Sequence, residues 1–107
     1  MSSILPSDPE FTTPVYGTVF ARRSEVVHRL HAGDPLILVP DPPDAEPAHV
    51  WVHAPGGDVV GHLSPDVNGW LAPTMFNGAR YGAEVTDVRG DDVESWKRLV
   101  ITVRRSA

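Results

Sequence analysis

The residues best suited to chemistry in this chain are an aromatic side chain and two arginines that follow it closely. Phe20 precedes Arg22 and Arg23 in the segment FARRSE. Binding of a single nucleic-acid strand requires rings that stack on bases beside cations that neutralise phosphates. The cluster therefore predicts a surface for single-stranded nucleic acid. The competing interpretation puts Phe20 in the core and leaves the arginines as the solvated start of a helix.

Other aromatic residues are spread along the chain and could extend such a surface. They are Tyr16, Trp51, Tyr81 and Trp96. Trp51 alternates with two valines in HVWVHA, so it points away from the core if the valines point into it. It then either faces solvent or packs under the helix predicted for 65–76, and the second arrangement is the more common one for a tryptophan.

The histidines raise the question of a metal site. His49 and His53 share one face of a predicted strand, and His62 could lie on the paired strand, which would bring three imidazoles together. However, His49 and His53 would be about 13 Å apart along an ideal strand, too far to share one ion. His28 and His31 offer only two ligands on a short helix. We expect neither a metal nor another cofactor.

A proline-rich acidic stretch, PDPPDAEPA at 40–48, separates two predicted strands. Asp41, Asp44 and Glu46 lie within it and Asp34 precedes it. These carboxylates could bind Ca²⁺ or Mg²⁺, but the spacing of a calcium-binding loop is absent and prolines interrupt the run. We expect a stiff, solvated loop. Its proline content also suits a docking surface, because a polyproline segment loses little entropy on binding.

Patterns typical of enzymes are weak. Ser64 and Ser95 lie in no nucleophile elbow, and the glycine pair Gly56-Gly57 is followed by an acidic residue that would repel phosphate. We therefore expect a binding protein without catalytic activity.

Composition limits the class of protein further. The chain has 107 residues, a net charge of −5 and no cysteine. This length suits one domain. The acidity argues against a surface that grips duplex DNA through many phosphates, so any phosphate-binding surface must be a local patch. The sequence contains neither a long apolar run nor a typical signal peptide at its start, so we expect a cytoplasmic protein that does not enter a membrane.

The elements expected from sequence pattern describe a mainly β protein. A flexible tail is expected at 1–13, followed by one domain over 14–105. Within it we predict strands at 15–20, 35–39, 49–54 and 59–63, helices at about 24–31 and 65–76, and two final strands within 79–88 and 96–105. Strand 35–39 reads as buried on both faces. Five to six short antiparallel strands with one main helix indicate a small, partly open, OB-like β-barrel.

Four stretches of the chain, taken in order, resemble one known family. They are AGDPLILVPDP, HVWV, GGDVVGHLSPDVNGWLAPTMFNGA and EVTDV. Their order and spacing over about 14–104 resemble a HIRAN domain. The resemblance implies an OB-like barrel of the kind that accompanies DNA-remodelling helicases in DNA repair and also stands alone in bacteria and phages. It implies binding of single-stranded DNA, with the 3′ hydroxyl end held in a pocket, and a helicase or nuclease as a possible protein partner.

The resemblance also indicates site residues. The family pocket uses aromatics after a glycine in the first strand, an Asn-Pro-aromatic-Asp loop and the histidine of a VGHL strand. Here His62 lies in VGHL and Phe20 stands where a stacking aromatic is expected. The loop departs from the pattern, because it reads Asp-Ala-Glu-Pro, so Asp44 or Glu46 would have to replace the missing carboxylate. The altered loop leaves an alternative open: a protein-interaction module that keeps the barrel and has lost the end pocket.

Overall fold

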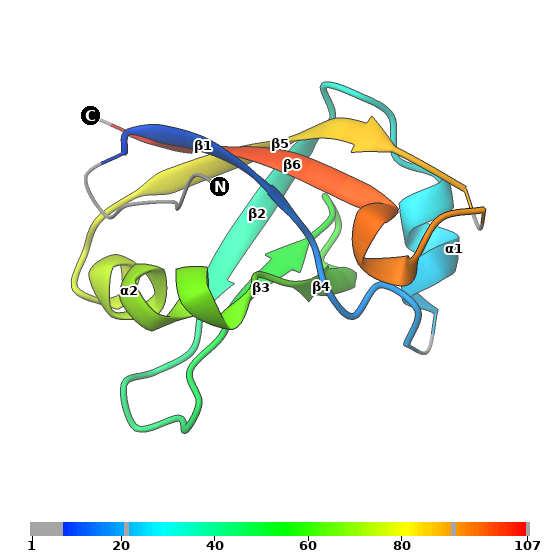
Figure 1. Ribbon diagram of the computed structural model, residues 1–107. Coiled ribbons are helices and arrows are strands. Elements are labelled where there is room, and N and C mark those ends of the chain that lie inside the picture. The colour runs from blue at the N-terminus through cyan, green and yellow to red at the C-terminus, as the bar shows by residue number, and fades with distance from the viewer. Residues whose placement is uncertain (1–7, 21, 91, 107) are drawn as a thin grey trace.

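A sheet of six antiparallel strands forms the body of the protein in the computed structural model, which describes residues 8–20, 22–90 and 92–106 (Figure 1). The strands follow one another across the sheet in the order β1-β6-β5-β2-β3-β4. Their bounds are β1 Glu10–Pro14, β2 Pro35–Pro40, β3 Val50–His53, β4 Val59–His62, β5 Tyr81–Val88 and β6 Leu99–Arg105. The helices are α1, Arg23–His28, and α2, Pro65–Phe76, and a 3₁₀ turn spans Ser95–Lys97.

The sheet curls until its two edges meet at one residue pair. Just after β1, the amide of Tyr16 donates to the carbonyl of His62 at 2.8 Å, and the His62 amide donates to the Tyr16 carbonyl at 3.0 Å. The strands thus form a half-barrel joined at one end, which confirms the predicted open, OB-like architecture. Helices α1 and α2 lie at opposite ends of the sheet (Figure 1).

Gly61 makes this edge contact possible. A Cβ atom at Gly61 would overlap the Tyr16 carbonyl oxygen and lie 2.6 Å from Val15 Cγ1. Any side chain here would push β4 away from the segment after β1. The glycine of the VGHL sequence is therefore required by the close approach of two backbones.

The interior of the half-barrel is filled by apolar side chains from every strand and from both helices. Leu63, Leu71, Leu99 and Ile101 have no exposed surface. The expectation that 35–39 is buried on both faces is wrong. Leu36 and Leu38 are buried, while Ile37 and Val39 are 52% and 41% exposed. An antiparallel sheet whose second face is not covered by helices produces this alternation.

The start of the domain differs most from the sequence prediction. Residues 10–13, expected in a flexible tail, belong to β1, which pairs with β6 from Glu10 opposite Arg104 to Pro14 opposite Val100. The expected strand at 15–20 is absent except for the single bridge at Tyr16. Gly17, with φ of +73°, turns the chain out of the extended conformation. Residues 1–7 of the expected tail lie outside the described residues.

The main helix is confirmed and the short one is smaller than expected. Helix α2 spans the predicted 65–76, with Pro65 in its first turn and Gly78 in a left-handed conformation after its end. Helix α1 covers only 23–28 of the predicted 24–31, and its cap is Arg22 instead of Ser24. No helix among the described residues has the length and apolar character that a membrane crossing requires.

Candidate nucleic-acid interface

A continuous line of ring contacts crosses the joined end of the half-barrel, and we call it the aromatic strip. The Trp96 ring lies nearly parallel to Tyr16, with centroids 6.4 Å apart, and Tyr16 lies nearly parallel to His62 at the same distance. The His62 ring then meets Trp51 edge to face at 5.6 Å. The strip comprises Trp96, Tyr16, His62 and Trp51. It offers flat surfaces of the kind on which nucleic-acid bases stack.

Arg23 extends the strip towards Phe20. Its guanidinium carbon lies 5.7 Å from the Phe20 ring centroid and 5.7 Å from that of Trp51, both within cation–π range. Its Nη1 donates to the Gly17 carbonyl at 3.0 Å. Because α1 begins at Arg23, the helix and this hydrogen bond together fix a cation between two rings. Such an arrangement favours contact with a phosphate beside a stacked base.

The Arg23 guanidinium and the His62 imidazole both lie close to Gly17, where a side chain would crowd them. A Cβ atom on Gly17 would lie 3.2 Å from Arg23 Nη1 and 3.2 Å from His62 Nε2. Both polar groups therefore border the same small space, and a side chain at this position would fill it. The left-handed backbone of Gly17 adds a second reason for glycine here.

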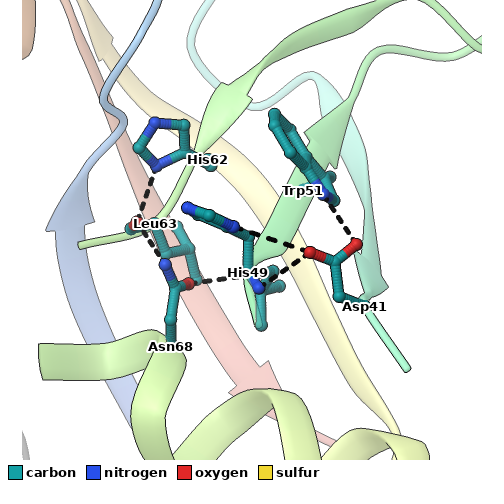
Figure 2. Close-up of polar contacts among 7 residues, drawn as sticks. Asp41, His49, Trp51, His62, Leu63 and Asn68 are labelled. Carbon is teal, nitrogen blue, oxygen red and sulfur yellow. Dashed lines mark hydrogen bonds and ion pairs between the residues drawn. The ribbon is translucent and has the colours of Figure 1, made fainter. Parts of the chain in front are cut away.

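The hydrogen bonds of His62 decide what its free nitrogen can do. His62 Nδ1 lies 2.9 Å from the Leu63 carbonyl oxygen (Figure 2). A carbonyl only accepts, so Nδ1 carries the proton. In the neutral ring Nε2, on the Gly17 side, is then an acceptor, suited to a hydroxyl or amino group. The protonated ring would donate from Nε2, which suits a phosphate oxygen.

Asp41 holds the far end of the strip in position (Figure 2). Its carboxylate accepts from Trp51 Nε1 at 2.9 Å and from the His49 amide at 3.0 Å, and His49 Nδ1 lies 3.5 Å away. The His49 ring contacts both Trp51 and His62, at centroid distances of 5.3 and 5.1 Å. Asp41 thus orients two rings, with one hydrogen bond accepted by each carboxylate oxygen.

A buried amide connects this network to α2. Asn68 is 3% exposed; its Oδ1 accepts from the Val50 amide at 3.0 Å, and its Nδ2 donates to the Leu63 carbonyl at 2.8 Å (Figure 2). The same Leu63 carbonyl also accepts from His62. Helix α2 therefore fixes the relative positions of β3 and the end of β4, and with them Trp51 and His62.

The structure brings some of the predicted site residues together and separates others. Phe20 is 62% exposed, so the interpretation that put it in the core is wrong. Its ring contacts Arg23, and Arg23 also contacts Trp51. The Trp51 ring in turn contacts His62. Arg22 is exposed at the start of α1 beside this group. Asp44 and Glu46 instead lie on the proline-rich loop and take part in none of the ring and cation contacts of this group, and Glu46 lies on the wall of a cleft.

The sequence analysis named Tyr16, Trp51 and Trp96 only as possible extensions of the surface, whereas their rings form most of the aromatic strip. Trp51 does not pack under α2 as expected; its ring lies among Arg23, His49 and His62. The signal was the register, because Trp51 lies directly opposite His62 on the neighbouring strand. Such cross-strand pairs are the unit of side-chain contact on a sheet. The contact of Tyr16 with Trp96 joins segments eighty residues apart, and no local pattern indicates it.

The cleft next to the strip lies between the proline-rich loop and α2. Its volume is about 350 Å³. His49 borders both the strip and the cleft, so the two are neighbours. Pro43, Pro47 and Pro73 contribute to its apolar walls.

One carboxyl group near the strip, that of Glu94, has a lowered pKa. A hydrogen bond from its own backbone amide, and then the hydrogen bond and charge of Lys97, hold the pKa of Glu94 below its ordinary value of 4.5. Lys97 Nζ lies 3.2 Å from Glu94 and 4.8 Å from the Trp96 ring centroid. The charged form of Glu94 thus supports the turn that carries Trp96. Within the described ranges, His, Asp and Glu side chains form no group of three that could hold a metal ion.

Known proteins provide no relative from which the role of this site could be inferred. Neither a family model, nor a curated protein, nor a solved structure matches the chain. The interpretation of the site therefore depends on its own residues and contacts.

Proposed function

We propose that this protein is a HIRAN-like module that binds single-stranded DNA or DNA ends weakly and performs no catalysis. The observation that carries the proposal is the aromatic strip together with Arg23, which combines stacking surfaces and a fixed cation. Stacking of bases on such rings is tolerant of sequence, so we expect little base preference.

The chemistry of binding follows from three features of the strip. Bases stack on Trp96, on Tyr16 and on the exposed ring of Phe20. A phosphate oxygen accepts from the guanidinium of Arg23, with Arg22 adding longer-range attraction. The neutral His62 ring accepts a hydrogen bond at Nε2, which suits a terminal hydroxyl better than a terminal phosphate. With a net charge of −5 the protein repels the remaining phosphates, which keeps the affinity low. The contact of Arg23 with a phosphate releases counterions, so the affinity also falls with salt.

Two further parts belong to the same proposal. Asp44 or Glu46 contacting the terminal hydroxyl remains a prediction from the family resemblance. So does a cytoplasmic location, where the module would work beside a helicase or nuclease.

Fluorescence anisotropy of a labelled single strand at low salt tests the proposal. One strand ends in a 3′ hydroxyl and the other in a 3′ phosphate. We expect binding that prefers the hydroxyl and that weakens when Phe20→Ala and His62→Ala are combined. Circular dichroism must first show that the double variant remains folded.

Three results would reject all or part of this function. Absence of binding at high micromolar protein would reject it. Unchanged affinity in the folded double variant would reject the aromatic strip as the site. Binding that ignores the chemical nature of the end would leave a plain phosphate-binding surface and remove the role given to His62.

A further inference from the structure

The cleft between the proline-rich loop and α2 is a second concave surface, separate from the exposed rings of the strip. Its volume of about 350 Å³ lies near the lower end of the range for ligand sites. Its walls are largely proline, alanine and glycine, including Pro43, Ala45, Pro47 and Gly69. Such walls offer aliphatic contact with few hydrogen-bond donors. An occupant must therefore bring an apolar stem.

The charges around this cleft have one sign. The loop 40–49 and helix α2 together carry Asp41, Asp44, Glu46 and Asp66, and neither segment contains lysine or arginine. Asp41 is engaged by Trp51 and His49. Asp44, Glu46 and Asp66 form no ion pair with any residue that the structure describes, and Glu46 lines the cleft itself. The cleft is thus apolar inside with an uncompensated acidic rim.

We infer that the cleft is a docking site for a basic peptide segment of a partner protein, with a lysine or arginine as its anchor. The aliphatic stem of such a side chain would lie against the proline walls, and its charged end would reach the carboxylates at the rim. Hydrogen bonds from an ammonium or guanidinium group to a carboxylate are charge-assisted, so they are shorter and stronger than hydrogen bonds between neutral groups. The acidic rim therefore favours a basic segment over a neutral or acidic one.

The same argument separates the cleft from the strip. A nucleic-acid strand brings a phosphate with every base, and phosphates are repelled by the carboxylates at this rim. The strip and the cleft meet at His49 and Asp41, which line the cleft and contact rings of the strip. One face of the molecule can therefore hold DNA while the adjacent cleft holds a basic segment of another protein. This role does not depend on the stacking surfaces of the strip and would survive their failure to bind DNA. It does compete with one part of the proposed function, the contact of Asp44 or Glu46 with a terminal hydroxyl.

Nuclear magnetic resonance of the isotopically labelled full chain tests the inference. The probe is a short capped peptide of alternating lysine and alanine, compared with norleucine and glutamate counterparts. We expect the lysine peptide to shift the amide resonances of Ala45, Ala48 and Gly69. The norleucine and glutamate peptides should shift them far less.

Two variants address the two properties of the cleft. Asp44→Asn combined with Glu46→Gln removes rim charge, and we expect the affinity for the lysine peptide to fall about tenfold. The matched control, Asp58→Asn with Asp92→Asn, changes the net charge equally at exposed positions outside the cleft and should leave affinity unchanged. Gly69→Leu fills the cleft from an exposed position of α2 where a Cβ meets no atom within 4 Å, so the fold tolerates it. It should abolish the shifts.

Several outcomes would overturn the inference. One is an equal response to the norleucine peptide, which would mark an apolar cavity without preference for a cation. Another is an equal loss in the charge-matched control, which would mark a general electrostatic effect. Shifts that persist in Gly69→Leu, the absence of any shift at millimolar peptide, or the same cleft resonances responding to an oligonucleotide instead would also reject it.

Discussion

The outer face of the curved sheet has two halves that are built differently. On β1, β6 and β5 the outward side chains satisfy one another: Arg104 donates to Glu10 at 2.7 Å and to Glu84, and the hydroxyls of Thr86 and Thr102 are 2.6 Å apart. On β3 and β4 the outward side chains are the rings of Trp51 and His62, joined by Tyr16 and Trp96.

The difference indicates which half is available to a ligand. Exposed ion pairs between neighbouring strands add little to stability, but they occupy the charges that a phosphate would need. In the aromatic half, by contrast, Arg23 contacts rings and a carbonyl, and no described carboxylate forms an ion pair with it. The other half also places a cation over a ring, Arg105 over Tyr81, but that ring is buried, whereas Phe20 beside Arg23 is exposed.

The largest expected effect is on the free energy of unfolding, when one glycine in each half is replaced by alanine. Gly61→Ala forces a Cβ into the Tyr16 backbone, and we expect the free energy of unfolding to fall by about 3 kcal/mol. Gly82→Ala on β5 meets no atom within 4 Å and should change it by less than about 0.5 kcal/mol. Urea denaturation measures both. Equal effects would show that the edge contact at Tyr16 does not hold the aromatic half together.

The second comparison concerns binding. Trp96 is 42% exposed, so Trp96→Ala should leave the fold intact while the affinity for a single strand falls by about five- to a hundredfold, the loss typical of one stacked base. Thr86→Ala in the polar half should leave affinity unchanged. Fluorescence anisotropy measures the affinity of both variants for the single strand. Similar affinities would show that Trp96 is not part of the interface.

A third, smaller effect separates a positioned cation from general charge. Arg23→Gln and Arg104→Gln change the net charge equally. We expect the first to weaken binding a few-fold and to reduce the dependence of log affinity on log salt by about 0.7, the value for one phosphate contact on a single strand. The second should change neither, because Glu10 and Glu84 already occupy Arg104. A similar loss in both variants would mean that the whole surface contributes.

The smallest expected effect is a dependence on pH at the turn that carries Trp96. Since the folded-state pKa of Glu94 lies below 4.5, its charged form stabilises the fold above that value, and this contribution is lost as the pH falls through the folded-state pKa. We expect the carboxyl resonance of Glu94 to titrate below 4.5, and Lys97→Met to move its pKa upwards. An unchanged titration in this variant would show that Lys97 does not hold the turn.

Local patterns predicted most of the architecture and only part of the site. Pro65, Gly78 and the apolar spacing of α2 are signals within one segment, and that helix was located correctly. β1 was missed because EFTTP alternates too briefly, and its strand conformation depends on β6, ninety residues away. Phe20, Arg23 and His62 were expected on one surface from their types and from the resemblance. The ring that connects them, Trp51, could be placed only from the pairing of β3 with β4.

The rings of the strip also originate from segments that are distant in the chain: after β1, on β3, on β4 and in the turn before β6. The unfolded chain has no such surface, so a ligand of the strip binds the native state alone. By mass action, occupancy then adds to the free energy of unfolding, about 2.7 kcal/mol at a ligand concentration one hundred times Kd. A rise in the thermal midpoint of the unlabelled protein therefore reports that the strip is occupied.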